Sequence, residues 1–181
     1  MSIIITKEHL TLQRTNESGF RAIINESRVA RNLSSPTTGV TVFLSHKHDE
    51  VEILEDVISL LKKCGVNVYV DWTDEGMPKT TCGLTAVKLK EKITNCNKFI
   101  FLGTEGAIAS KWCNWELGIG DAKKYPNNIA VMPIADSSGV YSGSEYLQIY
   151  PVIKSEYTYV AGSYYVEWNS NRISLAEWLK R

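Results

Sequence analysis

From residue 40 onward, the chain alternates short apolar runs with stretches of helical periodicity, and this order constrains the fold more than any other feature. The first run, residues 40–44, is apolar on both faces, as a strand buried inside a parallel sheet should be. Three further runs repeat the cycle at residues 66–70, 99–102 and 129–134. Repeated β–α units with short links predict an α/β protein whose open parallel sheet carries helices on both faces.

Helix boundaries in the first two units are predicted from capping residues. Asp49 and Glu52 form a candidate capping pair for the helix that follows the first strand, and Gly65 is placed to end it. Thr80 or Thr81 is predicted to cap the helix that follows the second strand. Each of these helices carries an apolar stripe that the sheet would bury.

The end of the chain is less regular. Pro133 predicts that the fourth strand ends there or lies at an edge of the sheet. A last strand is expected at residues 157–160 or 164–168, followed by a short helix that Ser174 caps.

Residues 1–39 are expected to form an N-terminal extension, with a domain at residues 40–181. In the extension, one helix face would carry Phe20, Ile23 and Ile24, and residues 33–39 read as a linker rich in Ser, Thr, Pro and Gly.

Composition excludes several classes of partner. Twenty basic and twenty acidic residues cancel, so no net field is expected to draw the chain to nucleic acid or to a membrane. No apolar run reaches the length of a transmembrane helix, and the first ten residues do not read as a signal peptide. The four cysteines are scattered without zinc-site spacing, which favours reduced thiols in a cytoplasmic protein.

Open parallel sheets bind ligands beyond the carboxyl ends of their strands. That rule selects Ser45, His46 and Lys47 after the first strand, and Asp71 and Trp72 after the second. It also selects Gly103 and Thr104 after the third strand, and the start of the following helix in the stretch SKWCNWELGIGDAKK. Its single glutamate, Glu116, is either an ordinary surface group or the wall of a binding pocket.

The chain resembles the TIR domain family over roughly residues 40–180, and two stretches carry the resemblance. They are FLSHKHDE, at the end of the first strand, and SKWCNWEL, which contains Trp112-x-x-x-Glu116. The resemblance implies a flavodoxin-like fold with a five-stranded parallel sheet. It also places Glu116 at the catalytic position of TIR enzymes that cleave NAD, which is their substrate rather than a cofactor.

Among TIR proteins, the chain is most similar to those of the bacterial Thoeris anti-phage system. Such proteins convert NAD into a cyclic or modified ADP-ribose, a diffusible signal that activates a separate effector. The resemblance therefore implies self-association through TIR surfaces and a trigger that comes from phage infection.

One glutamate is sufficient for this chemistry. Nicotinamide leaves NAD as a neutral molecule, so no general acid is required, and a carboxylate can stabilise the oxocarbenium-like ribose. Trp112 lies one helical turn before Glu116 and is expected at the pocket edge, whereas Trp115 is expected mainly in packing. Cys113 is expected to be packed rather than nucleophilic, because no basic partner is evident.

The loops after the first two strands would complete the substrate site. Ser45, His46 and Lys47 precede a helix N-terminus, which favours a diphosphate. Lys47 adds charge, while His46 either bonds ribose or phosphate or acts as a capping or solvent-facing histidine. Trp72, beside Asp71, either stacks on a base or anchors the loop.

Several other functions would require residues that this sequence does not place where they are needed. A metal site is not expected: His48, Asp49 and Glu50 follow His46, but no further histidine follows them and only His9 remains elsewhere. A phosphorelay receiver would need an aspartate at the end of the third strand, where this sequence has FLGT at residues 101–104. A P-loop NTPase would need a Walker motif, which the sequence lacks. Two alternatives stay open: a nucleoside deoxyribosyltransferase-like enzyme, and a non-catalytic TIR adaptor that acts by self-association.

Overall fold

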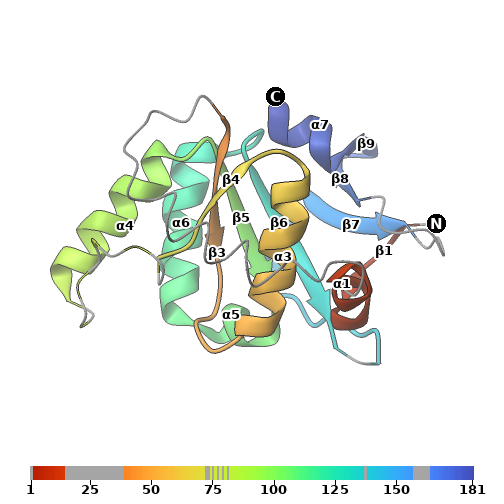
Figure 1. The fold of residues 1–181 in the computed structure, drawn as a ribbon, viewed down its shortest axis with the longest axis horizontal. Coiled ribbons are helices and arrows are strands. Elements are labelled where there is room, and N and C mark those ends of the chain that lie inside the picture. The colour runs from red at the N-terminus through yellow and green to blue at the C-terminus, as the bar shows by residue number, and fades with distance from the viewer. Residues whose placement is uncertain are drawn as a thin grey trace.

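The computed structural model describes residues 2–14, 39–71, 74, 76, 78, 80, 82–136, 138–156 and 164–181. A central sheet runs through the molecule, with helices packed on both of its faces (Figure 1). The strands that carry the fold are β3 (Thr41–Ser45), β4 (Asn67–Tyr69), β5 (Lys98–Gly103), β6 (Ile129–Ala135), β7 (Val152–Glu156), β8 (Tyr164–Trp168) and β9 (Asn171–Ser174).

The five strands from β4 to β7 form the predicted parallel sheet. Their order is β4-β3-β5-β6-β7, and every neighbouring pair is parallel. This is the flavodoxin-like order. The order of the strands reverses between β3 and β5, and folds of this class bind their ligands at such a point, outside the carboxyl ends of the strands. Strands β8 and β9 extend the sheet beyond β7 as antiparallel neighbours.

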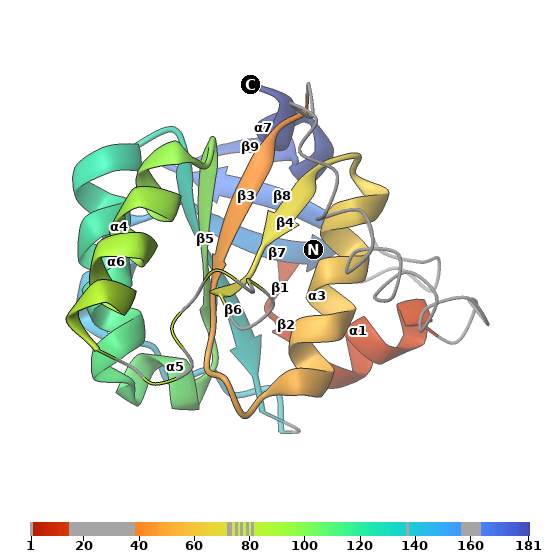
Figure 2. The same ribbon diagram turned by 60° about the vertical axis from the view of Figure 1, so that its left-hand side comes forward.

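Two layers of helices cover the sheet (Figure 2). One face carries α1 and α3, and the other carries α4, α5 and α6. The helices are α1 (Lys7–Arg14), α3 (Val51–Lys63), α4 (Gly83–Asn95), α5 (Glu105–Ala109), α6 (Lys111–Lys124) and α7 (Leu175–Lys180), with a 3₁₀ turn η3 (Glu145–Ile149) before β7.

Alternation along the strands divides the core into two parts. In β3, Val42 and Leu44 pack with α3, whereas Phe43 packs with residues of α4 and α6. Phe43 and Phe99, on neighbouring strands, stack with ring centroids 5.5 Å apart. Because both faces of these strands are covered, the strands are apolar throughout, which is the pattern that made them recognisable in the sequence.

The first residues of the chain are part of the sheet. Strand β1 (Ser2–Ile3) pairs with β7, and β2 (Ile5–Thr6) pairs with β6. Ile5 is completely buried. The helix expected around Phe20 lies outside the described residues, as does the linker expected at residues 33–39 except for Gly39, so the boundary of the extension stays a prediction.

Several predicted boundaries differ from the structure. The N-cap of α3 is Glu50, without a side-chain capping bond, so the Asp49–Glu52 pair was wrong. The N-cap of helix α4 is Cys82, which follows the two predicted candidates, Thr80 and Thr81. Gly65 does follow the end of α3, in the left-handed region with φ +82. Ser174 caps α7 as predicted, by accepting a hydrogen bond from the backbone N–H of Glu177.

Strand β6 is an inner strand that continues two residues past Pro133, so the prediction of a strand end or edge was wrong. The proline is tolerated because it lies where the ladder changes partner: Val131 pairs with β7, whereas Ile134 pairs with β2. The fifth parallel strand is β7, which neither candidate range for the last strand included. Residues 164–168 form β8 instead, and residues 157–160 lie outside the described part of the chain.

Within the part of the chain that the structure describes, no helix is long and apolar enough to cross a membrane. The cysteines Cys64, Cys82, Cys96 and Cys113 are free thiols, as the sequence analysis expected.

Candidate active site

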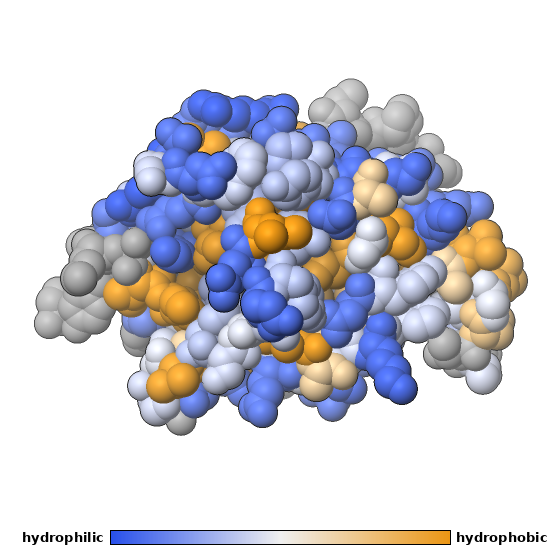
Figure 3. Space-filling view, turned by 180° about the vertical axis from the view of Figure 1, so that it is seen from behind, coloured by the Kyte–Doolittle hydropathy of each residue, from blue (hydrophilic) through white to orange (hydrophobic). Residues whose placement is uncertain are grey.

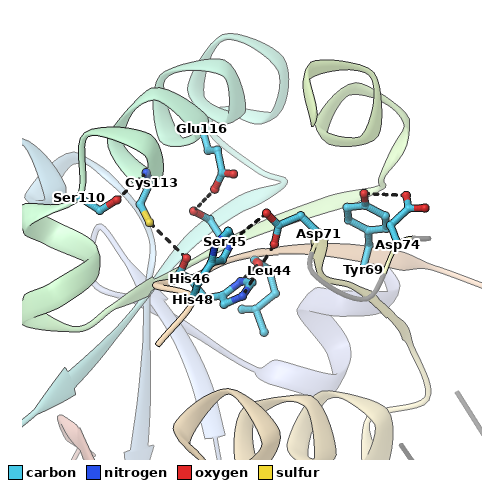
Figure 4. Close-up of polar contacts among 10 residues, drawn as sticks. All are labelled: Leu44, Ser45, His46, His48, Tyr69, Asp71, Asp74, Ser110, Cys113 and Glu116. Atoms are coloured by element: carbon cyan, nitrogen blue, oxygen red, sulfur yellow. Dashed lines mark hydrogen bonds and ion pairs between the residues drawn. The ribbon is translucent and has the colours of Figure 1, made fainter. Parts of the chain in front are cut away.

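A hydrogen bond joins the end of β3 to the middle of α6. The hydroxyl of Ser45 donates to Oε2 of Glu116 over 2.6 Å (Figure 4). Ser45 is 1% exposed and Glu116 3% exposed, so Glu116 is not a surface glutamate. The carboxylate lies at the carboxyl ends of the parallel strands, where this fold class binds its ligands.

Burial dominates the electrostatics of Glu116. Loss of water raises the pKa of Glu116 to about 8, and the negative charge of Asp71 acts in the same direction. The hydrogen bond from Ser45 and the nearby ring of His48 lower the pKa, but by less than burial raises it. Near neutral pH the site therefore holds a carboxyl group that a small change in its surroundings can ionise.

His46 lies almost fully buried beside this pair. Its Nδ1 is 3.0 Å from the carbonyl oxygen of Leu44, and its Nε2 is 3.8 Å from Oδ1 of Asp71. Burial lowers the pKa of His46, which favours the neutral imidazole. The capping or solvent-facing role that the sequence left open for His46 does not fit a residue that is 5% exposed.

His48 approaches the same aspartate from the solvent side. Its Nε2 lies 2.8 Å from Oδ2 of Asp71, and this hydrogen bond raises the pKa of His48. Asp71 is buried, so its carboxylate stands between one buried and one exposed imidazole (Figure 4). The loops after β3 and β4 thus meet at Asp71.

The loop after β3 is held in place from the other side by α5. Thr104 donates its hydroxyl to Oε2 of Glu50 over 2.6 Å and accepts the backbone N–H of Ala107. A Cβ at Gly106 would lie 2.9 Å from Oε1 of Glu50, so a larger residue there would have to displace this carboxylate. These contacts fix the segment that carries His46 and His48.

Cys113 is packed, as predicted. It is 3% exposed, and its thiol donates to the carbonyl oxygen of His46 over 3.2 Å. Burial raises the pKa of Cys113 to about 11, which keeps the thiol protonated and unreactive.

The other predicted site residues are placed differently. The amine of Lys47 lies 3.6 Å from Oδ1 of Asp49, an exposed pair. Trp112, in α6, is partly buried and packs against the core. Its ring stacks on that of Trp115 with centroids 5.1 Å apart. Trp115 is 37% exposed, so the packing expected of it is with the ring of Trp112 at the surface. Trp72 lies outside the described residues.

Two contributors were not selected as site residues. His48 and Glu50 orient the aspartate and the loop, and both lie in the loop after β3, whereas their partner region at Thr104 was selected from the end of the third strand. Their position after a β-strand is the signal that could have found them, because all loops at the carboxyl edge of a parallel sheet converge on one region.

The arrangement provides one buried, ionisable carboxylate, a hydroxyl that orients it, and two imidazoles within reach of one aspartate. Such a set suits the stabilisation of positive charge at a reacting carbon more than acyl transfer, because the neighbouring thiol is protonated and packed.

Comparison with known proteins agrees with this geometry. A family model described as the TIR domain matches residues 42–156, which include the strands β3 to β7, except for the first residue of β3, and the helix of Glu116. The chain is 31% identical over 120 residues to a protein of Bacillus cereus (strain MSX-D12) named "Probable 3' cyclic ADP-D-ribose synthase ThsB'". It is 27% identical over 79 residues to a protein of Cytobacillus dafuensis named "Putative cyclic ADP-D-ribose synthase TIR2".

Both similarities are partial. The first covers 62% of this chain and 59% of the Bacillus protein, and the second covers 42% of this chain and 21% of the Cytobacillus protein. The family match, in contrast, takes in more than half of the chain and all of the parallel sheet but its first residue. The chain therefore belongs to the TIR domain family.

Proposed function

We propose that this protein cleaves the bond between nicotinamide and ribose in NAD and makes a cyclic or modified ADP-ribose signal for anti-phage defence. The observation that carries the proposal is the buried carboxylate of Glu116, held by Ser45 at the carboxyl edge of the sheet. Both named relatives, described as cyclic ADP-D-ribose synthases, support the same reaction class.

The electrostatics of Glu116 suit a cationic substrate. With a pKa of about 8, the carboxyl group is mostly protonated at neutral pH before a ligand binds. A pyridinium ring placed beside it would stabilise the carboxylate form and lower that pKa. The substrate would then ionise the group that stabilises the oxocarbenium-like ribose as nicotinamide departs.

The reaction balances without a redox step. The bond between the ribose carbon and the nicotinamide nitrogen breaks, and its electron pair leaves with neutral nicotinamide. In a cyclisation, a nucleophilic atom elsewhere in the same nucleotide bonds to that carbon and releases a proton. Water as nucleophile would instead give linear ADP-ribose, and the two relatives' names favour cyclisation.

The predicted substrate contacts belong to this proposal. Ser45 orients Glu116, and His46, Lys47 and Asp71 come from the two loops beside the carboxylate. Trp72 and Trp112 would contact the nicotinamide or adenine ring. Lys47 must leave its exposed pair with Asp49 to reach a diphosphate, a small cost for a surface ion pair.

Self-association through TIR surfaces, a phage-derived trigger and an effector reached by the diffusible product complete the proposal. On the face seen in Figure 3, hydrophobic residues form small patches separated by hydrophilic ones. A surface of this kind favours regulated association over a permanent apolar interface.

The test is nicotinamide release from NAD by the purified protein, with mass spectrometry of the ADP-ribose product. Glu116→Gln keeps the shape and removes the charge, so we expect kcat/KM to fall by about 100-fold or more. Glu91→Gln, on the exposed side of α4, is the matched control and should keep full activity.

The assay is repeated in lysate from phage-infected cells, which supplies a trigger if one is needed. Equal turnover by the protein and its Glu116→Gln variant would contradict the proposal. Silence in both conditions would favour the adaptor, and consumption of nucleosides instead of NAD would favour the deoxyribosyltransferase.

A further inference from the structure

We propose that His46, His48 and Asp71 form a binding site for one divalent transition-metal ion beside Glu116. Each residue offers one ligand atom, and these atoms all lie within 4.8 Å of one another. The Asp71 carboxylate points toward both imidazoles, one oxygen to each (Figure 4). Nothing in this inference depends on the reaction proposed for Glu116.

The buried ring of His46 gives the strongest indication. Its Nδ1 faces the carbonyl oxygen of Leu44 at 3.0 Å, and a carbonyl can only accept, so Nδ1 carries the proton. Nε2 then presents a lone pair. Among the described residues this buried nitrogen has no hydrogen-bond partner. A buried acceptor without a partner is costly, and a metal ion in front of Nε2 would remove that cost.

The contact of Nδ1 also matches the usual support of a metal-binding histidine. Such a residue donates its second ring N–H to a backbone carbonyl or a carboxylate, which fixes both the tautomer and the ring orientation. Leu44 supplies that carbonyl from β3. The ring is therefore already oriented for coordination through Nε2.

A simple ion pair explains only part of the cluster. His48 and Asp71 make an ordinary hydrogen bond of 2.8 Å, which accounts for Oδ2 and for the exposed ring. Nε2 of His46 and Oδ1 of Asp71 remain 3.8 Å apart, too far for a hydrogen bond. In a tetrahedral zinc site with bonds of about 2.0–2.1 Å, neighbouring ligand atoms lie roughly 3.3 Å apart, between these two distances.

The ligand types indicate the class of ion. Two imidazole nitrogens and one carboxylate oxygen suit Zn²⁺ and the neighbouring first-row metals better than Mg²⁺ or Ca²⁺, which prefer oxygen. Three protein ligands leave at least one position for water or for an oxygen of a bound molecule. The carboxylate of Asp71 also brings a negative charge that favours a cation, while the amine of Lys47 is paired with Asp49.

The sequence alone predicts no metal site, because no further histidine lies near His46 and His48. Asp71 lies 23 positions beyond His48 and reaches the imidazoles only because β3 and β4 are parallel neighbours. The missing ligand is therefore supplied by the fold.

The test is metal binding by the full-length protein after removal of metal with a chelator. We expect calorimetric titration with Zn²⁺ to give a stoichiometry near one, and cobalt substitution to give the visible absorption of a tetrahedral site. His48→Ala is the main variant, because this side chain is 58% exposed and its loss should not unfold the protein.

His48→Ala and Asp71→Asn should each weaken binding by more than about 10-fold, the lower end of the loss seen when only a supporting residue is removed. His9→Ala is the matched control and should bind as the parent does. Absence of Zn²⁺ binding by the parent would overturn the proposal. So would binding that persists unchanged in His48→Ala, because the ion would then lie elsewhere.

Discussion

Glu116 is a residue whose pKa is set by two opposing influences. Burial favours the protonated form, whereas the hydroxyl of Ser45, 2.6 Å away, stabilises the ionised form. If the ionised form is the active one, kcat/KM rises with pH through the pKa of the free enzyme, which is about 8. In that case Ser45 would contribute to activity without touching the reacting bond.

Replacing Ser45 with alanine tests this influence. The variant loses the hydrogen bond that lowers the pKa of Glu116, so the rise in kcat/KM should move to higher pH than in the parent. At pH 7, activity should fall by roughly the same factor as the ionised fraction. The measurement is nicotinamide release across pH 6 to 10.

Ser59→Ala, at a buried serine of α3 remote from the site, serves as the control and should keep the parental profile. A Ser45→Ala profile that stays in place or moves to lower pH would show that the hydrogen bond does not stabilise the ionised carboxylate.

At this scale, sequence reasoning worked where a single residue carries a recognisable pattern. Glu116 and Ser45 were selected from a motif and a strand end, and the structure joins them. The meeting of His48 with Asp71 was not predictable, because it depends on how far two loops extend toward each other. The number of residues between His48 and Asp71 does not indicate the distance between their side chains.

Helix α6 positions Glu116, and it lies close against the sheet at Gly120. A Cβ at Gly120 would lie 2.9 Å from the ring of Phe99, a fully buried side chain of β5 that stacks on Phe43. The ring has no room to move, so any side chain at this position must push the helix away from the sheet.

Gly120→Ala should therefore reduce nicotinamide release although residue 120 is one turn away from Glu116. The displaced helix would lengthen the bond between Ser45 and Glu116, and we expect at least about a 10-fold loss of kcat/KM. Overpacking should also lower the free energy of unfolding by about 1–3 kcal/mol. Turnover assays and urea denaturation measure the two effects.

Gly118→Ala is the matched control in the same helix, since a Cβ there meets nothing within 4 Å. That variant should keep its activity and gain about 1 kcal/mol of stability from helix propensity. Equal behaviour of the two variants would show that close packing at Gly120 does not set the position of Glu116.

Among the elements, the four strands read from continuous apolar runs were predicted and β7 was missed. Residues of β7 alternate between buried and half-buried and include Lys154 and Ser155, so the strand lacks a continuous apolar run. Its place in the sheet comes from pairing with β6 on one side and β8 on the other. The cap of α3 was also misplaced, because its N-cap residue, Glu50, bonds Thr104 across the loop instead of its own helix.

For the molecule as a whole, the first strands are a structural part of the domain. Ile5 is completely buried between the end of β6 and α3, within the same core cluster as Leu54 and Met132. Residues 2–6 should therefore unfold together with the parallel sheet, as one cooperative unit.

Ile5→Ala tests this. We expect the free energy of unfolding to fall by about 2–5 kcal/mol in urea, with a single transition. Ile149→Ala, at a residue that is 51% exposed, is the control and should change stability by less than about 1 kcal/mol. A small effect of Ile5→Ala would mean that the first strands are only loosely attached.

The burial of Glu116 also makes folding a proton-binding reaction. The unfolded chain releases this proton near pH 4.5, whereas the folded protein keeps it until about pH 8. Between these values the native state binds more protons than the unfolded state, so this group's contribution to stability declines as the pH rises. The pH values at which Glu116 is ionised are thus the values at which this residue contributes least to the stability of the fold. Thermal stability and turnover should therefore follow opposite trends with pH.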